Sequence, residues 1–94
     1  MEELIGLQLK ETKGNFYVSV DGQQEGKMTF EFAGNDKIII DHTEVNPGHT
    51  GKGYAKKMVA KAVEFARDKN IKIIPLCPFV KKVFDETPEF RDVL

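Results

Sequence analysis

The strongest constraint on the fold is a change of hydrophobic period at a glycine-rich stretch, NPGHTGKGYAKKM, residues 46–58. Before it, residues 37–45 (KIIIDHTEV) form a β-branched run that is typical of a central strand. After it, apolar residues recur every three or four positions over residues 54–69, the spacing of a helix with one buried face. A second buried strand is expected at residues 71–76. Two strands joined through a helix make a crossover, which predicts parallel neighbours.

The remaining segments predict antiparallel strands and a short helix. Residues 15–20 and 27–32 alternate between apolar and polar side chains and are separated by a turn signal at Asp21-Gly22. An edge strand is expected at residues 4–11. Pro78 suits the start of a short helix over residues 79–86, in which Phe79, Val83 and Phe84 are expected to pack in the core.

The fold class is therefore α/β (α+β), with a mixed, mostly antiparallel sheet of about five or six strands. One long crossover helix and one short C-terminal helix complete it. We expect residues 1–94 to form a single minimal domain, since 94 residues are too few for two cores.

Composition excludes several classes of function. The 14 basic and 15 acidic residues give a net charge of −1, which argues against broad binding to nucleic acid. The longest apolar run, IIPLCPFV, is too short to cross a membrane. With a single cysteine, Cys77, no intrachain disulfide can form, and we expect a reducing, cytoplasmic setting. Two histidines and one cysteine at unrelated spacings predict no metal site.

The glycine turn predicts an anion site. The first N–H groups of a helix have no internal partner, and the helix dipole makes that end partly positive. Gly51 and Gly53 leave the backbone open to a ligand. Lys52, Lys56 and Lys57 add positive charge close by. The alternative is that the glycines only shape a tight turn. The Walker and G-x-G-x-x-G patterns do not fit, since Asn46 and Lys56 stand where each needs a glycine.

The stretch VNPGHTGKGYAKKMVAKAVEFARDK resembles the acetyl-coenzyme A motif of the GNAT N-acetyltransferases, Q/R-x-x-G-x-G/A. Thr50 takes the place of the Q/R, Gly53 that of the first glycine and Ala55 that of the final small residue. DHTEV, GKGYAKK, PLCPFVKKVF and TPEFRDVL follow one another as in the very short GNAT-like subfamily. The resemblance covers about residues 15–94. It implies transfer of acetyl from acetyl-coenzyme A to an amine.

The resemblance also implies where the coenzyme lies. It threads between the two parallel strands, backbone near Val45 holds the acetyl oxygen, and the glycine turn holds the pyrophosphate. Thr50 offers no cation in the place of the Q/R, and Phe84 stands where many GNAT enzymes carry an acidic tyrosine. The coenzyme-binding residues expected on this basis are Val45, Thr50, Gly51, Lys52, Gly53, Tyr54, Ala55 and Lys56.

Cys77 and His42 are the catalytic candidates. Cys77 stands between a buried strand and a helix start, which favours thiolate, so it could be a nucleophile, an acid or a pocket-lining residue. The alternative is a small buried hydrophobe. His42 suits a general base. By strand alternation it shares a face with Ile38 and Ile40 unless a bulge intervenes, and on neighbouring parallel strands it could form a dyad with Cys77.

The expected partners are a coenzyme A thioester and an amine acceptor, either a small molecule or a peptide. A competing function is a module that binds acyl-coenzyme A without turnover, which Phe84 in the acid position favours. A structural domain without a ligand is a third interpretation.

Overall fold

A computed structural model describes residues 2–49 and 51–94 of the chain. Its five strands form one sheet in the order β1-β2-β3-β4-β5. The first four pair antiparallel, and β5 pairs parallel with β4. The elements are β1 (Glu3–Lys10), β2 (Lys13–Val20), β3 (Gln23–Ala33), β4 (Lys37–Val45), α1 (Tyr54–Lys69), β5 (Lys72–Pro75), α2 (Pro78–Glu86) and a 3₁₀ helix, η1 (Pro88–Val93).

The predicted fold class is confirmed, including the edge strand, the parallel pair and both helices. Asn70 ends α1 in the left-handed conformation, with φ of 56°, as suits an asparagine at a helix C-cap. The short turn η1 was not predicted. It is held by Arg67 of α1, whose guanidinium donates to both carboxylate oxygens of Asp92 at 3.0 and 2.7 Å.

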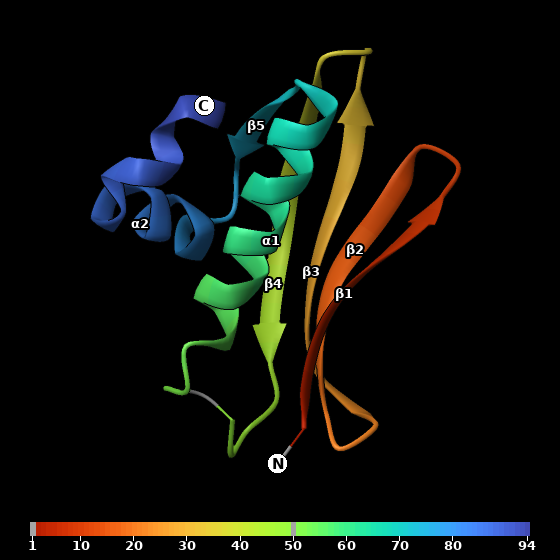
Figure 1. Ribbon diagram of the computed structural model, residues 1–94, viewed down its shortest axis with the longest axis vertical. Helices are drawn as coiled ribbons and strands as arrows, with labels where there is room; N and C mark the ends of the chain where they lie inside the picture. The colour runs from red at the N-terminus through yellow and green to blue at the C-terminus, as the bar shows by residue number, and fades with distance from the viewer. Residues whose placement is uncertain (1, 50) are drawn as a thin grey trace.

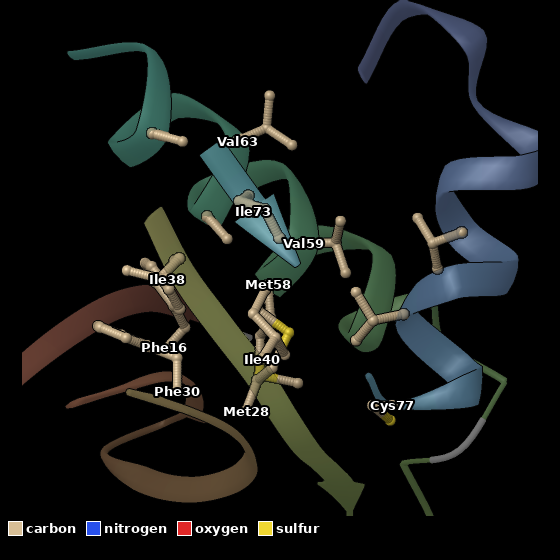
Figure 2. Packing of buried hydrophobic residues seen from close by; sticks show 14 of the residues in the cluster. Phe16, Met28, Phe30, Ile38, Ile40, Met58, Val59, Val63, Ile73 and Cys77 are labelled. Carbon is tan, nitrogen blue, oxygen red and sulfur yellow. The ribbon is translucent and has the colours of Figure 1, made fainter. Parts of the chain in front are cut away.

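The core lies between one face of the sheet and α1, with α2 and η1 beside α1 (Figure 1). Strand residues on this face are buried against the apolar stripe of the helix (Figure 2). The main contributors are Phe16, Met28, Phe30, Ile38 and Ile40 from the sheet and Met58, Val59 and Val63 from α1. Strand residues that point to the other face are half-buried or exposed. We call this other side the open face.

A β-bulge changes the direction of the side chains in the second half of β4. Thr29 of β3 pairs with His42, whereas Phe30 pairs with Ile40, so Asp41 is left over. An extra residue in one strand moves every following side chain to the opposite face. Thr43, opposite Met28, therefore joins the core side, and His42 points to the open face. The expectation that His42 shares a face with Ile40 is wrong for this reason.

The two parallel strands part immediately beyond this bulge. Their pairing runs from Lys37 with Lys72 to Ile40 with Pro75 and then stops. The amides of Leu76 and Cys77 both donate to the carbonyl of Ile40, at 3.0 and 3.2 Å, and the chain turns into α2. The rest of β4 continues toward the glycine turn paired with β3 but no longer with β5 (Figure 1). We call this gap between the ends of β4 and β5 the splay.

The last buried residue before the splay provides a test of the core. Replacing Ile40, which is fully buried, by alanine should lower the free energy of unfolding by about 2–5 kcal/mol, because it removes methyl groups and leaves a cavity. Leu4→Ala is the control: Leu4 is 55% exposed, so its loss should change stability by only about 0.5 kcal/mol. Urea unfolding measures both. Equal effects would contradict the assigned core.

Candidate functional site

A cavity of about 320 Å³ lies on the core side of the splay, between the start of α1 and one face of α2. This volume is at the lower end of the range usual for ligand sites. Its lining comes from two parts of the chain that are far apart in sequence. The glycine turn and α1 contribute Val45, His49, Gly51, Gly53, Tyr54, Ala55 and Lys56, and α2 and its end contribute Phe79, Lys82, Val83, Glu86 and Thr87.

The N-terminus of α1 faces this cavity without a cap. The N-cap residue is Gly53, in the left-handed conformation with φ of 78°, and the first turn contains no acidic residue. The first bond within the helix runs from the Lys57 amide to the Gly53 carbonyl, at 3.0 Å. The amides of residues 54–56 therefore have no partner within the helix. With Lys56 and Lys82 beside them, these amides make a positive end suited to an anion.

The glycine turn is fastened to β3 through Glu25. The backbone amide of Asn46 donates to the Glu25 carbonyl at 2.8 Å, and its side-chain amide donates to the Glu25 carboxylate at 2.9 Å. The other carboxylate oxygen lies 3.3 Å from Nε2 of His49. The His49 ring stacks on Tyr54, with ring centroids 5.8 Å apart. These contacts hold the turn at both ends, so the positive helix end keeps its position beside β4.

Tyr54 and Lys57 both bind Glu3 of β1. The hydroxyl of Tyr54 donates to Glu3 at 3.3 Å, and Lys57 forms an ion pair with the same carboxylate. The hydrogen bond from Lys57 holds the pKa of Glu3 below its usual value. Burial, together with Glu3, raises the pKa of Tyr54. Tyr54 is therefore a neutral anchor for the helix start, and Lys57 is engaged with the edge strand, whereas Lys56 lines the cavity.

Cys77 is the N-cap residue of α2 and is only 9% exposed (Figure 2). Burial raises the pKa of its thiol, but the amides of Val80 and Phe79 and the hydroxyl and amide of Thr43 outweigh it, so the pKa is lowered overall. The sulfur makes no capping hydrogen bond of normal geometry. These groups therefore act on it as nearby dipoles. Cys77 does not itself line the cavity described above; its neighbour Phe79 does.

His42 lies on the other side of β4 from Cys77. Its side chain is 62% exposed on the open face, and Nε2 is 3.5 Å from a carboxylate oxygen of Glu44. Lys27 reaches the other oxygen of Glu44 at 3.9 Å. The expected dyad of His42 and Cys77 is therefore not formed, because the bulge at Asp41 directs the imidazole away from the core side. Thr43, on the core side, is the β4 residue that helps to lower the pKa of Cys77.

The expected coenzyme-binding residues are largely brought together. Six of them line the cavity: Val45, Gly51, Gly53, Tyr54, Ala55 and Lys56. Lys52 is exposed and is not part of the lining, and Thr50 lies outside the described residues.

Sequence reasoning missed the wall that α2 contributes. Phe79, Lys82, Val83 and Glu86 recur at helical spacing, which was a usable signal for a second face of the helix. Phe84 and Val83 are buried as expected, but Phe79 is 55% exposed, so its assignment to the core was wrong.

Comparison with known proteins identifies the family. The sequence profile described as GCN5-related N-acetyl-transferase matches residues 15–93. The chain belongs to the GCN5-related N-acetyltransferase (GNAT) family. The resemblance seen in the glycine turn is thus confirmed over most of the chain.

The sheet, the crossover helix and the splay form the GNAT fold. The solution structure of a GCN5-like protein from Staphylococcus aureus is 34% identical, with a TM-score of 0.71, over 94% of this chain and 85% of that one. A predicted acetyltransferase from Clostridium acetobutylicum, crystallised with acetyl-CoA, is 19% identical with a TM-score of 0.65, over 81% and 56% of the two chains. Protein NATD1 of Xenopus tropicalis is 27% identical over 74 residues, which cover 78% of this chain and 68% of the relative.

Two further observations concern residues 2–49 and 51–94. No helix there is both long and apolar enough to cross a membrane. No group of three or more histidine, cysteine, aspartate or glutamate side chains is arranged there to hold a metal ion.

The conformation of Gly53 generates a prediction about the turn. A Cβ at this position would meet nothing within 4 Å, so the cost of a substitution is backbone strain at positive φ. Gly53→Val should therefore lower the free energy of unfolding by about 1–3 kcal/mol. Gly53→Asn, which tolerates the left-handed region, should lose clearly less. Thermal or urea unfolding compares them, and equal losses would contradict the strain argument.

Proposed function

We propose that this chain is an acetyl-CoA-dependent N-acetyltransferase that transfers acetyl to an amine. The observation that supports the proposal most is the cavity at the splay, where the uncapped end of α1 meets the end of β4 that no longer pairs with β5. The Clostridium acetobutylicum protein, which shares the fold, was crystallised with acetyl-CoA. The residues of this cavity fit such a ligand, since it offers an anion site beside an apolar wall.

The pyrophosphate lies against the amides of residues 54–56, with Lys56 and Lys82 supplying positive charge. The peptide-like arm of the coenzyme lies along β4. The carbonyl of Ile40 points to the β5 side, and after the bulge the alternation of an antiparallel strand directs the backbone groups of Thr43 and Val45 the same way. Beyond the splay these groups are free to pair with the arm as with an added strand. The Val45 backbone holds the acetyl oxygen.

The acceptor amine approaches from the open face, where His42 lies. The amine nitrogen attacks the thioester carbonyl carbon, the C–S bond breaks, and coenzyme A leaves as a thiolate. His42 takes the proton that the nitrogen loses, and a carboxylate oxygen of Glu44 lies 3.5 Å from its Nε2. Cys77 supplies a proton to the thiolate from the core side. The bulge thus puts the base on the acceptor side of β4 and the thiol on the coenzyme side.

In a covalent route, Cys77 acts as the nucleophile and not as the acid. The Cys77 thiolate attacks the thioester carbonyl, coenzyme A leaves, and the amine then attacks the acetyl-cysteine. The lowered pKa of Cys77 supports this route, since the thiolate is the nucleophile. Rapid quenching followed by peptide mass spectrometry distinguishes the two routes, because only the covalent one places acetyl on Cys77.

Binding of acyl-coenzyme A without turnover is the second candidate function. Two observations favour it: His42 and Cys77 lie on opposite sides of β4, and Phe84, in the position of the family's acidic tyrosine, is buried and has no proton to give. The acceptor that we propose is an amine of either a small-molecule or a peptide class.

The anion site predicts a charge effect on binding. Lys56→Glu should weaken acetyl-CoA binding by roughly tenfold or more, because it places a carboxylate beside the pyrophosphate. Lys81→Glu makes the same charge change on the exposed side of α2, outside the cavity lining, and should change the affinity by about twofold at most. Calorimetric titration measures both. Equal weakening would show that net charge, and not this site, controls binding.

Turnover is tested by release of free coenzyme A thiol from acetyl-CoA in the presence of mixed amines. His42→Gln and Cys77→Ala should each slow release by roughly 10²-fold or more. Glu31→Gln, on the same face as His42 but on β3, should leave it unchanged. Unchanged release in both site variants would overturn the catalytic roles. Binding by the native chain with no release for any amine would favour the binding module.

A further inference from the structure

Thr43 has no part in the expected catalytic pair, yet the bulge places its side chain on the core side of β4, the side on which Cys77 is buried. We propose that Thr43 is a positioning residue: its hydroxyl, in place of the His42 imidazole, holds and polarises the Cys77 sulfur at the splay. This inference rests on the proposed function for its catalytic meaning. The placement of Thr43 on the core side depends only on the fold.

The bulge at Asp41 creates this placement. Without the extra residue, His42 would point to the core side and Thr43 to the open face. With it, the side chain of Thr43 follows Ile40 onto the core side, where it faces the start of α2. Its backbone amide turns toward the splay by the same alternation and also acts on the sulfur. Two hydrogen-bond donors of Thr43, its hydroxyl and its amide, therefore lie on the side of β4 where Cys77 is buried.

The hydroxyl of Thr43 has no hydrogen-bond partner among the described residues. Its oxygen is buried and makes no hydrogen bond of normal geometry within the described residues. The hydroxyl of Thr29, on the open face of the neighbouring strand, instead donates to Asp41 at 2.6 Å. A buried hydroxyl without a partner is costly, so its presence needs an explanation. A sulfur that carries negative charge during the reaction supplies that partner.

The groups around the sulfur define what Thr43 can do. They are the hydroxyl and amide of Thr43 and the amides of Phe79 and Val80, none of which titrates near neutral pH. A hydroxyl can stabilise the thiolate by donating a hydrogen bond but cannot remove the thiol proton as a base. Cys77 is therefore expected to ionise without a histidine, and this distinguishes it from the dyad that the sequence suggested.

The test titrates Cys77 through the ultraviolet absorbance of its thiolate, with Cys77→Ser as the baseline because Cys77 is the only cysteine. In Thr43→Val, which keeps the shape and removes the hydroxyl, the titration should move to higher pH, and the thiolate fraction at neutral pH should fall by roughly threefold to tenfold. Thr43→Ser should titrate like the native chain. Thr29→Val, the matched removal of a hydroxyl on the open face, should also leave it unchanged.

The thiol titration decides the role of Thr43 without any assay of turnover. An unshifted titration in Thr43→Val, or an equal shift in Thr43→Ser, would overturn the proposal, and a shift in His42→Gln of the same size would restore the dyad. If Thr43→Val does not fold, Thr43→Ala carries the same expectation. Acetyl-CoA titration of the native chain tests the proposed function separately from the role of Thr43. Absence of binding would overturn the proposed function, while the thiol titration would still decide the role of Thr43.

Discussion

The whole site depends on the point at which β4 loses its regular pairing with both of its neighbouring strands. Its pairing with β5 ends at Ile40, and its bulge against β3 falls at the next residue, Asp41. The first event frees the backbone of β4 on one edge, and the second exchanges the faces of its side chains. The cavity, the position of Cys77 and the direction of His42 all follow from these two irregularities. The remainder of the sheet serves to hold this strand end in place.

Several features near the splay lower stability, and the rest of the fold offsets them. The helix α1 begins without a side-chain cap, which usually contributes about 1 kcal/mol. Gly48, Gly51 and Gly53 all have positive φ, and the Thr43 hydroxyl is buried without a partner. Such departures concentrate at functional sites. Here the compensation comes from the core between the sheet and α1 and from the attachment of the glycine turn to Glu25 and Glu3.

The sequence was sufficient for the strands, the two α-helices and the glycine turn, but not for η1 or for the faces of β4. The period change at residues 46–58 predicted the crossover, and from it the parallel pair and the place of the site, because both signals are local. The bulge at Asp41 depends on pairing with Thr29 and Phe30, which lie in another strand, so no spacing within residues 37–45 could reveal it. His42 was therefore assigned to the wrong face.

The cavity wall from α2 was missed for a related reason. Phe79 and Val83 are apolar at helical spacing, which indicates a buried face but not what buries it. Whether a face packs against α1 or borders a cavity is decided by the splay, a property of two strands together. Lys82 and Glu86, on the same face of α2, are the part of the pattern that a core does not explain.

The central claim is that the coenzyme binds to the positive N-terminal end of α1 and to the edge of β4 that is free of β5. The most direct test follows backbone amide resonances by NMR while acetyl-CoA is added to the native chain. The account predicts large, saturable shifts at Val45 and at residues 53–56, and small ones in the hairpin turns at Gly22 and Gly34. Saturable shifts confined to another surface, or none at millimolar ligand, would contradict it.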